Sequence, residues 1–190
     1  MSPILGIWAS QISGRLWEPA GAYDALATVT VPSGGAASVT FAGIPTGYKH
    51  LQIRGIARTA TGNANNAYIT LNGDTGANYS WHQLFGSGSG NAGASGSANQ
   101  SATGVSMFNF SDSTFAANIF GIGIMDILDY ANTNKFKTVR LLTGTDSNGG
   151  GFIIMRSAGW RNTAAITSIS ITPDSGTFAQ HTQFALYGVK

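Results

Sequence analysis

The chain has 190 residues and no cysteine, so its length suits one domain with a sizeable core, and disulfides and thiolate metal sites are excluded. Only 9% of its residues are charged, against roughly 25% in an average globular domain, and the net charge is +2. The lysines and arginines form no run, so nucleic-acid binding through a basic patch is not expected. No apolar stretch approaches the length of about 18 residues that would predict a transmembrane helix.

The first 22 residues differ from the rest of the chain. They are apolar and broken by glycine up to residue 16, and then form a Pro/Gly hinge. Pro3, Gly6 and Ser10 interrupt the apolar run and no Lys or Arg precedes it, so a signal peptide is not expected. We predict an N-terminal docking arm and hinge at 1–22, followed by a β-sandwich domain at 23–190. The arm would bury its large apolar side chains on another subunit: Ile4, Leu5, Ile7, Trp8, Ile12 and Leu16.

The first half of the domain alternates apolar and polar residues, which predicts strands with one wet face. In the segment from His50, the side chains of Leu51, Ile53 and Ala57 fall on one face, and Gly55 marks a bulge or a close backbone approach. Asn72-Gly73 between two such runs is a hairpin signal. The predicted strands are Leu26–Val31, Ser38–Phe41, His50–Arg58, Ala67–Leu71 and Tyr79–Phe85.

The second half begins with Gly86–Gly104, almost entirely Gly, Ser, Ala, Asn and Thr, which predicts a long exposed loop. Asn118–Leu128 is nearly continuous apolar and predicts a central strand buried on both faces. The remaining predicted strands are Ser106–Phe110, Phe136–Thr143, Phe152–Trp160, Ile166–Thr172 and Gln183–Tyr187. Ten or eleven strands without a convincing helix indicate an all-β, antiparallel two-sheet β-sandwich of jelly-roll type.

No catalytic or metal-binding constellation stands out. His50, His82 and His181 lack the spacing of a zinc site, and no cofactor is predicted. Asp126 and Asp129 could form the carboxylate pair of a glycosidase. The simpler interpretation is that Asp129 caps a turn with Asn132 and that Asp126 pairs with Lys135, Lys137 or Arg140. The segment from Asp146 to Gly151 resembles part of a calcium loop but lacks the ligands of an EF-hand.

Aromatic residues offer one further candidate site. Trp81 and Trp160 lie in or at the ends of predicted strands and could stack on a surface glycan. The usual role of such residues is packing in a core or a subunit interface, and that remains the default interpretation.

Four segments stand out as a set: Ser2–Gly14, Ile44–Arg54, Asp126–Thr138 and Phe184–Lys190. Together they resemble a family of small virion proteins of tailed bacteriophages, described as tail-fibre-like or structural. The resemblance spans the whole chain and is weakest in the Gly/Ser-rich middle. It implies a particle component without enzymatic activity, and it does not separate head from tail.

The leading hypothesis is a non-enzymatic phage structural protein that is held on the particle surface by its arm and displays its sandwich outward. Its expected partners are other virion subunits and copies of itself, with a trimer as one candidate form and a host-surface glycan as a further partner. A tail-fibre or adhesion module is slightly favoured over a capsid decoration protein, because the Gly/Ser-rich segment and the aromatic residues would suit host contact. The protein would be made in the host cytoplasm, without membrane insertion. Alternatives of another class are a carbohydrate-binding module and a glycan depolymerase.

Overall fold

The computed structural model of the protein describes residues 21–101 and 106–190, and the predicted docking arm lies outside these residues. The described residues form twelve β-strands in two sheets, and every pairing between these strands is antiparallel. This confirms the predicted all-β, two-sheet sandwich. The strands are β1 (Tyr23–Thr30), β2 (Val39–Ala42), β3 (His50–Ala57), β4 (Asn66–Leu71), β5 (Tyr79–Ser87), β6 (Ala92–Gln100), β7 (Ser106–Asn109), β8 (Gly121–Leu128), β9 (Lys137–Asp146), β10 (Gly151–Trp160), β11 (Ser168–Pro173) and β12 (Gln183–Val189).

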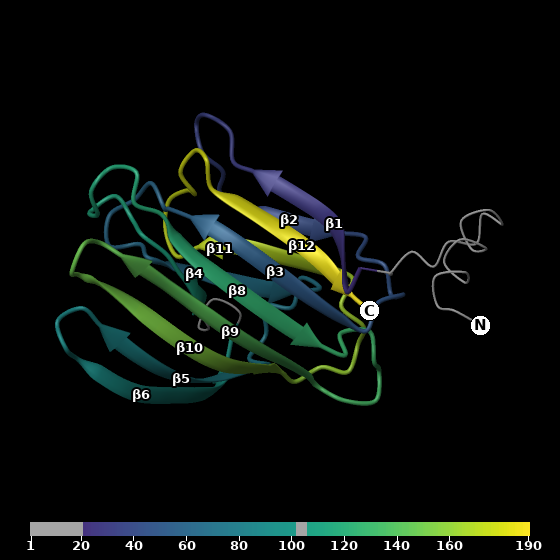
Figure 1. Ribbon diagram of the computed structural model, residues 1–190. Coiled ribbons are helices and arrows are strands. Elements are labelled where there is room, and N and C mark those ends of the chain that lie inside the picture. The colour runs from purple at the N-terminus through teal and green to yellow at the C-terminus, as the bar shows by residue number, and fades with distance from the viewer. Residues whose placement is uncertain (1–20, 102–105) are drawn as a thin grey trace, which may run out of the picture.

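The two sheets differ in size. The large sheet has the order β1-β12-β3-β8-β9-β10-β5-β6, and the small sheet has the order β2-β11-β4-β7. In Figure 1 the large sheet faces the viewer and the small sheet lies behind it. We call the side of the large sheet that is turned away from the small sheet the outer face. β7, the last strand of the small sheet, packs against β8, β9 and β10, so the β5–β6 hairpin lies beyond it at that edge of the large sheet.

The core lies between the sheets. An aromatic cluster forms its centre, with Phe184 on β12 and Phe178 before it at a ring-centroid distance of 5.3 Å, and Phe110 at 5.7 Å from Phe184. Gly55 lies on the same buried face as Ile53, and a Cβ atom there would come within 2.7 Å of the Phe184 ring. The pairing of β3 with both neighbours continues through Gly55 without a shift. Of the two predicted roles for this glycine, close approach is therefore the correct one.

The prediction of a long loop at Gly86–Gly104 is wrong, because most of that segment is strand. β5 runs on to Ser87 and pairs with β6 over Ala92–Gln100. Aromatic side chains from β5 cover the glycines of β6: a Cβ atom on Gly93 would meet the Phe85 ring at 2.8 Å, and one on Gly96 would meet the imidazole of His82 at 2.5 Å. Backbone pairing with β5 and the packing of these rings over glycine stabilise the segment as a strand. The composition of the segment alone does not show either interaction.

Two further expectations are corrected. Asn72-Gly73 does not join a hairpin, because β4 belongs to the small sheet and β5 to the large one, so the turn carries the chain between layers. Asn118–Leu128 is not buried on both faces either. Its strand begins at Gly121, and the side chains on its outer face are exposed. In addition, the described part of the chain holds no helix of the length and apolar character that crossing a bilayer requires.

Candidate interaction face of the large sheet

The outer face is arranged in rows, because paired residues on neighbouring strands stand side by side and every second residue points outward. The registers of β3, β8, β9, β10 and β5 define three rows across the middle of the sheet. The first apolar row is Ile56–Ile122–Gly144–Ile153–Gly86, and the second apolar row is Arg54–Ile124–Leu142–Met155–Leu84. The polar row is Gln52–Asp126–Arg140–Ser157–His82.

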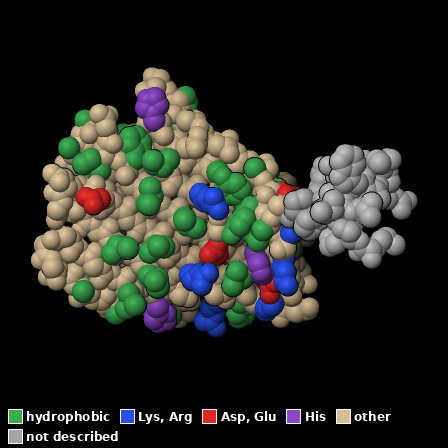
Figure 2. All heavy atoms as spheres, in the orientation of Figure 1, with side chains coloured by type: hydrophobic (Ala, Val, Ile, Leu, Met, Phe, Trp, Pro, Cys, Tyr) green, Lys and Arg blue, Asp and Glu red, His purple; other side chains and the backbone are tan. Residues whose placement is uncertain are grey.

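Large apolar side chains of the two apolar rows remain open to solvent. Their exposed fractions are 45% for Ile56, 61% for Ile122, 45% for Ile124, 45% for Leu142, 58% for Ile153, 55% for Met155 and 61% for Leu84. Figure 2 shows this face, with hydrophobic side chains spread over the middle of the large sheet and few charges among them. Single exposed apolar residues are ordinary, but a contiguous group of this kind marks a contact surface.

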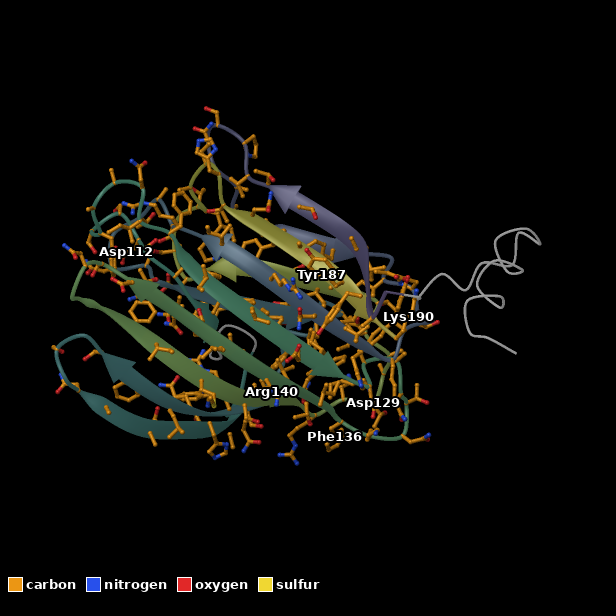
Figure 3. The ribbon with its side chains drawn as sticks, in the orientation of Figure 1. Asp112, Asp129, Phe136, Arg140, Tyr187 and Lys190 are labelled. Atoms are coloured by element: carbon orange, nitrogen blue, oxygen red, sulfur yellow. The ribbon has the colours of Figure 1, made fainter. Side chains whose placement is uncertain are left out.

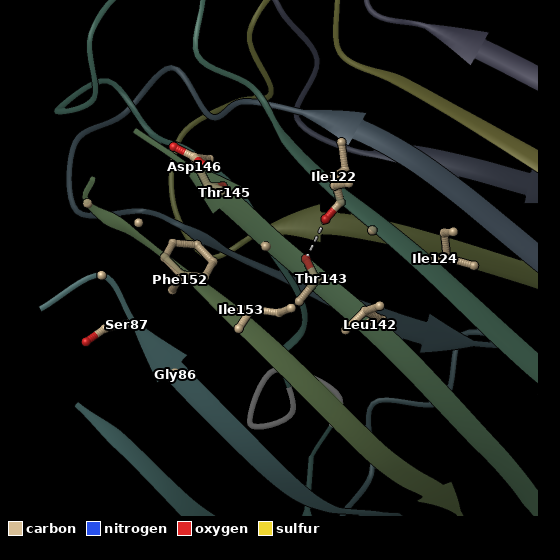
Figure 4. A pocket seen from close by; sticks show the side chains of 15 residues that line it. Gly86, Ser87, Ile122, Ile124, Leu142, Thr143, Thr145, Asp146, Phe152 and Ile153 are labelled. Atoms are coloured by element: carbon tan, nitrogen blue, oxygen red, sulfur yellow. Dashed lines mark hydrogen bonds between the residues drawn. The ribbon is translucent and has the colours of Figure 1, made fainter. Parts of the chain in front are cut away.

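In the first apolar row Gly144 lies between Ile122 and Ile153, and the missing side chain produces a groove. The groove has a volume of about 570 Å³. Ile122 and Ile153 stand on either side of Gly144, where the backbone forms the floor, and Leu142 and Ile124 continue the wall (Figure 4). A second groove of about 500 Å³ lies beside it along Leu84, Met155 and Arg140. The face therefore has ridges and furrows that fit apolar side chains from a partner.

Charged side chains near the apolar rows are held to one side. Arg54 would otherwise lie beside Ile124, but its guanidinium stacks on the rings of Tyr187 and Tyr23, at 5.0 and 5.3 Å from their centroids. Its Nε also donates a hydrogen bond to the side-chain oxygen of Gln52 (2.7 Å). These contacts fix the charge over the β12 side of the sheet and leave the apolar rows uncovered.

The polar row carries the predicted carboxylate Asp126. Its Oδ2 lies 3.3 Å from the Nη2 of Arg140, and its Oδ1 accepts a hydrogen bond from the amide of Gln52 (2.8 Å). Of the bases proposed as its partner, Arg140 is the one that it contacts. Asp126 thus sits in a shared network at the margin of the apolar surface.

Asp129 lies at the end of the sandwich with Phe136, as Figure 3 shows. Its carbonyl accepts the backbone N–H of Asn132 (2.9 Å), and its carboxylate binds the ammonium of Lys135, so the predicted turn role is confirmed. The hydrogen bond from Lys135 lowers the pKa of Asp129 below its usual 3.8. Its backbone N–H donates to Nδ1 of His50 (3.0 Å), so Asp129 is engaged locally in holding the turn.

The two tryptophans occupy different environments. Trp160 is 1% exposed, its ring belongs to the core, and its indole N–H donates to Asp74 (2.7 Å), so the ring does not reach the surface. Trp81 is half-buried on the inner face of β5, with the guanidinium of Arg156 at 5.3 Å from its ring centroid. Arg156 is itself buried, and this burial lowers its pKa to about 10. Glycan contact at Trp81 stays a prediction.

The other candidate ligands are dispersed. His82 lies on β5 and His181 lies in the turn before β12, and both are exposed. Asp146 accepts the backbone N–H of Asn148 within its own turn (2.8 Å). Within residues 21–101 and 106–190, no three His, Asp or Glu side chains come together in an arrangement that could hold a metal ion. The arm residues Ile4, Leu5, Ile7, Trp8, Ile12 and Leu16 lie outside the described residues.

Sequence reasoning missed the residues of the apolar rows. Ile122 and Ile124 were interpreted as core because the whole run is apolar. The sequence did carry a signal, because Gly121 and Gly123 alternate with Ile122 and Ile124. Successive side chains of a strand point to opposite faces, so when the glycines point inward the isoleucines must point outward. Comparison with protein-family models, with curated proteins and with solved structures finds no match for this chain.

Proposed function

We propose that the chain is a non-enzymatic structural subunit of a bacteriophage particle. In this proposal the N-terminal arm attaches it to other virion subunits, and the sandwich stands on the particle surface. The observation that supports a subunit role is the outer face, where seven large apolar side chains are 45–61% exposed on five adjacent strands. A surface of this kind serves contacts with other chains. The phage assignment itself rests on the four segments that resemble virion proteins.

The arm and the outer face have separate roles in this proposal. Burial of each large apolar side chain of the arm contributes roughly 1.5–3 kcal/mol, and this burial is the driving force that we propose for attachment. The Gly/Ser-rich β6 is the edge strand of the large sheet, and the half-buried Trp81 lies on the neighbouring β5, which suits an adhesion module more than a capsid decoration protein. Self-association of the chain and a host-glycan partner remain expectations within the proposal.

The test is deletion of residues 1–16 in cells that produce the particle. We expect the truncated chain to fold, with a thermal unfolding midpoint close to that of the full chain, and to be lost from purified particles. A matched control replaces the exposed Phe136 by Ser and leaves the arm intact, and it should be incorporated normally. Normal incorporation of the truncated chain, or loss of its fold, would refute arm docking. Immunogold labelling of particles then assigns the subunit to the tail or to the head.

A further inference from the structure

We infer that the outer face of the large sheet is covered by a second copy of the chain, in a two-fold dimer whose axis runs along the strands between β8 and β9. This inference rests on the proposed function as a structural subunit and names one of its contacts. Its basis is the register of the strands together with the side chains that each row presents.

The position of the axis follows from the strand order. The boundary between β8 and β9 has four strands on either side, so a rotation about it superimposes the whole sheet on its partner's sheet. Each strand then lies over a defined strand of the second copy: β8 over β9, β3 over β10, and β12 over β5. Two twisted sheets pack face to face at about −30°, and each copy takes half of that angle relative to the common axis. Strands keep their direction under this rotation, so close to the axis, on β8 and β9, each row meets the same row of the partner.

The rows are complementary when paired in this way. In the first apolar row, Ile122 lies over Gly144 of the partner subunit, so an exposed side chain meets the groove at a glycine. In the second apolar row, Ile124 lies over Leu142 of the partner subunit, and apolar surface meets apolar surface.

Charge complementarity also favours this axis. In the polar row, Asp126 lies over Arg140 of the partner subunit, and the same contact repeats by symmetry. Each carboxylate then meets a second guanidinium in addition to its own Arg140 at 3.3 Å. An axis across the strands would exchange the polar row with the first apolar row and place Asp126 over Ile122, which leaves a charge against hydrocarbon. The axis along the strands therefore satisfies the apolar rows and the polar row close to the axis. Arg54 lies further out, and its guanidinium is already stacked on the rings of Tyr187 and Tyr23.

The area is sufficient. Eight strands about 4.8 Å apart and about eight residues long make a face of roughly 1,000 Å². A standard protein–protein interface takes about 800 Å² from each partner. The apolar rows occupy the centre of this face and the polar row lies to one side, which is the usual distribution of a stable contact.

The experiment measures the mass of the full-length chain by sedimentation velocity over a range of concentrations. We expect a reversible dimer. Leu142→Arg places a charge at the centre of the contact and should raise the dissociation constant by at least about tenfold. The matched control is Phe136→Arg, which changes another exposed apolar residue, at the end of the sandwich, and should leave the dissociation constant unchanged. A monomer at all concentrations, an unaffected Leu142→Arg, or an equal effect of Phe136→Arg would each overturn the inference.

A charge exchange tests the register and does not depend on the folding of Leu142→Arg. In a homodimer of Asp126→Arg, the arginines at positions 126 and 140 of one copy would face the same two arginines of the other. In a homodimer of Arg140→Asp, two aspartates would face two aspartates. Each variant alone should therefore be monomeric. Mixed together, they should form a heterodimer with near wild-type affinity, since each arginine then meets an aspartate of the other chain. Homodimers of either variant, or no association in the mixture, would overturn the proposed register.

These results are separable from the proposed function. A chain that is monomeric but still incorporated through its arm refutes the dimer and leaves the structural role intact. A chain that dimerises through the outer face but never enters particles supports the dimer and refutes the virion role.

Discussion

The two faces of β8 carry similar residues in opposite surroundings. Met125 and Ile127 on the inner face are completely buried, whereas Ile122 and Ile124 on the outer face keep 61% and 45% of their surface exposed. The difference lies in what covers each face, because the small sheet packs on one side only. Alternation along a strand tells which residues share a face, and a second layer decides whether that face becomes core.

The largest expected effect is at the inner face. Phe184→Ala removes a fully buried ring from the aromatic cluster and should lower the free energy of unfolding by about 3–5 kcal/mol. Urea unfolding at a concentration where the chain is monomeric measures it. The matched control is Leu142→Ala on the outer face, which should cost less than about 1 kcal/mol under the same conditions. Equal costs at the two positions would show that the outer face is covered within a single chain.

A smaller effect is expected from glycines. Gly55→Ala on the inner face drives a methyl group to 2.7 Å from the Phe184 ring, and overpacking of this kind costs about 1–3 kcal/mol. Gly86→Ala on the outer face meets only a methyl group of Ile153 at 3.7 Å, an ordinary contact, and should change stability by less than about 0.5 kcal/mol. Thermal unfolding of both variants compares them. A neutral Gly55→Ala would mean that the aromatic cluster rearranges freely.

These positions also show how far the sequence predicts the fold. The all-β sandwich and most of the strands follow from alternation and turn residues, and the pairing of Asp126 with Arg140 was among the interpretations offered. These features depend on residues near one another in the chain or on adjacent strands, where local patterns carry information. The close approach at Gly55 was one of two alternatives, and the facing Phe184 decided between them.

What the sequence did not predict depends on distant pairing. β6 becomes a strand because β5 offers it a partner and aromatic cover over Gly93 and Gly96, and its own composition indicates a loop. The outer face stays open because the small sheet has four strands and packs on one side of the large one. Strand order determines both features, and no single segment encodes it.

The smallest of the three effects concerns Asp74, a carboxylate in the turn between β4 and β5 that is held by the indole of the buried Trp160. Burial raises the pKa of Asp74, but hydrogen bonds from the indole of Trp160, the amide of Asn78 and the N–H of Gly76 outweigh it and hold the pKa below 3.8. Asp74→Asn weakens these bonds and should cost about 1–2 kcal/mol at neutral pH. Since the folded-state pKa is lowered, the carboxylate stabilises the fold above pH 3.8, and this contribution disappears as the pH falls through the folded-state pKa. Urea unfolding of both proteins between neutral pH and about pH 2 should therefore show the difference shrinking towards acid.

The outer-face control for this prediction is Asp126→Asn. Arg140, its partner, is exposed, so solvent screens the pair, and the substitution should cost less than about 1 kcal/mol in the monomer. The indole of Trp160 is buried, and it keeps a fixed donor aimed at Asp74. If Asp126→Asn proves as costly as Asp74→Asn in dilute protein, the polar row is already shielded from water within one chain. In concentrated protein, a high cost of Asp126→Asn would instead indicate that a second copy covers the outer face and shields the polar row from water. The concentration dependence of this one variant therefore separates cover within the chain from cover by a partner.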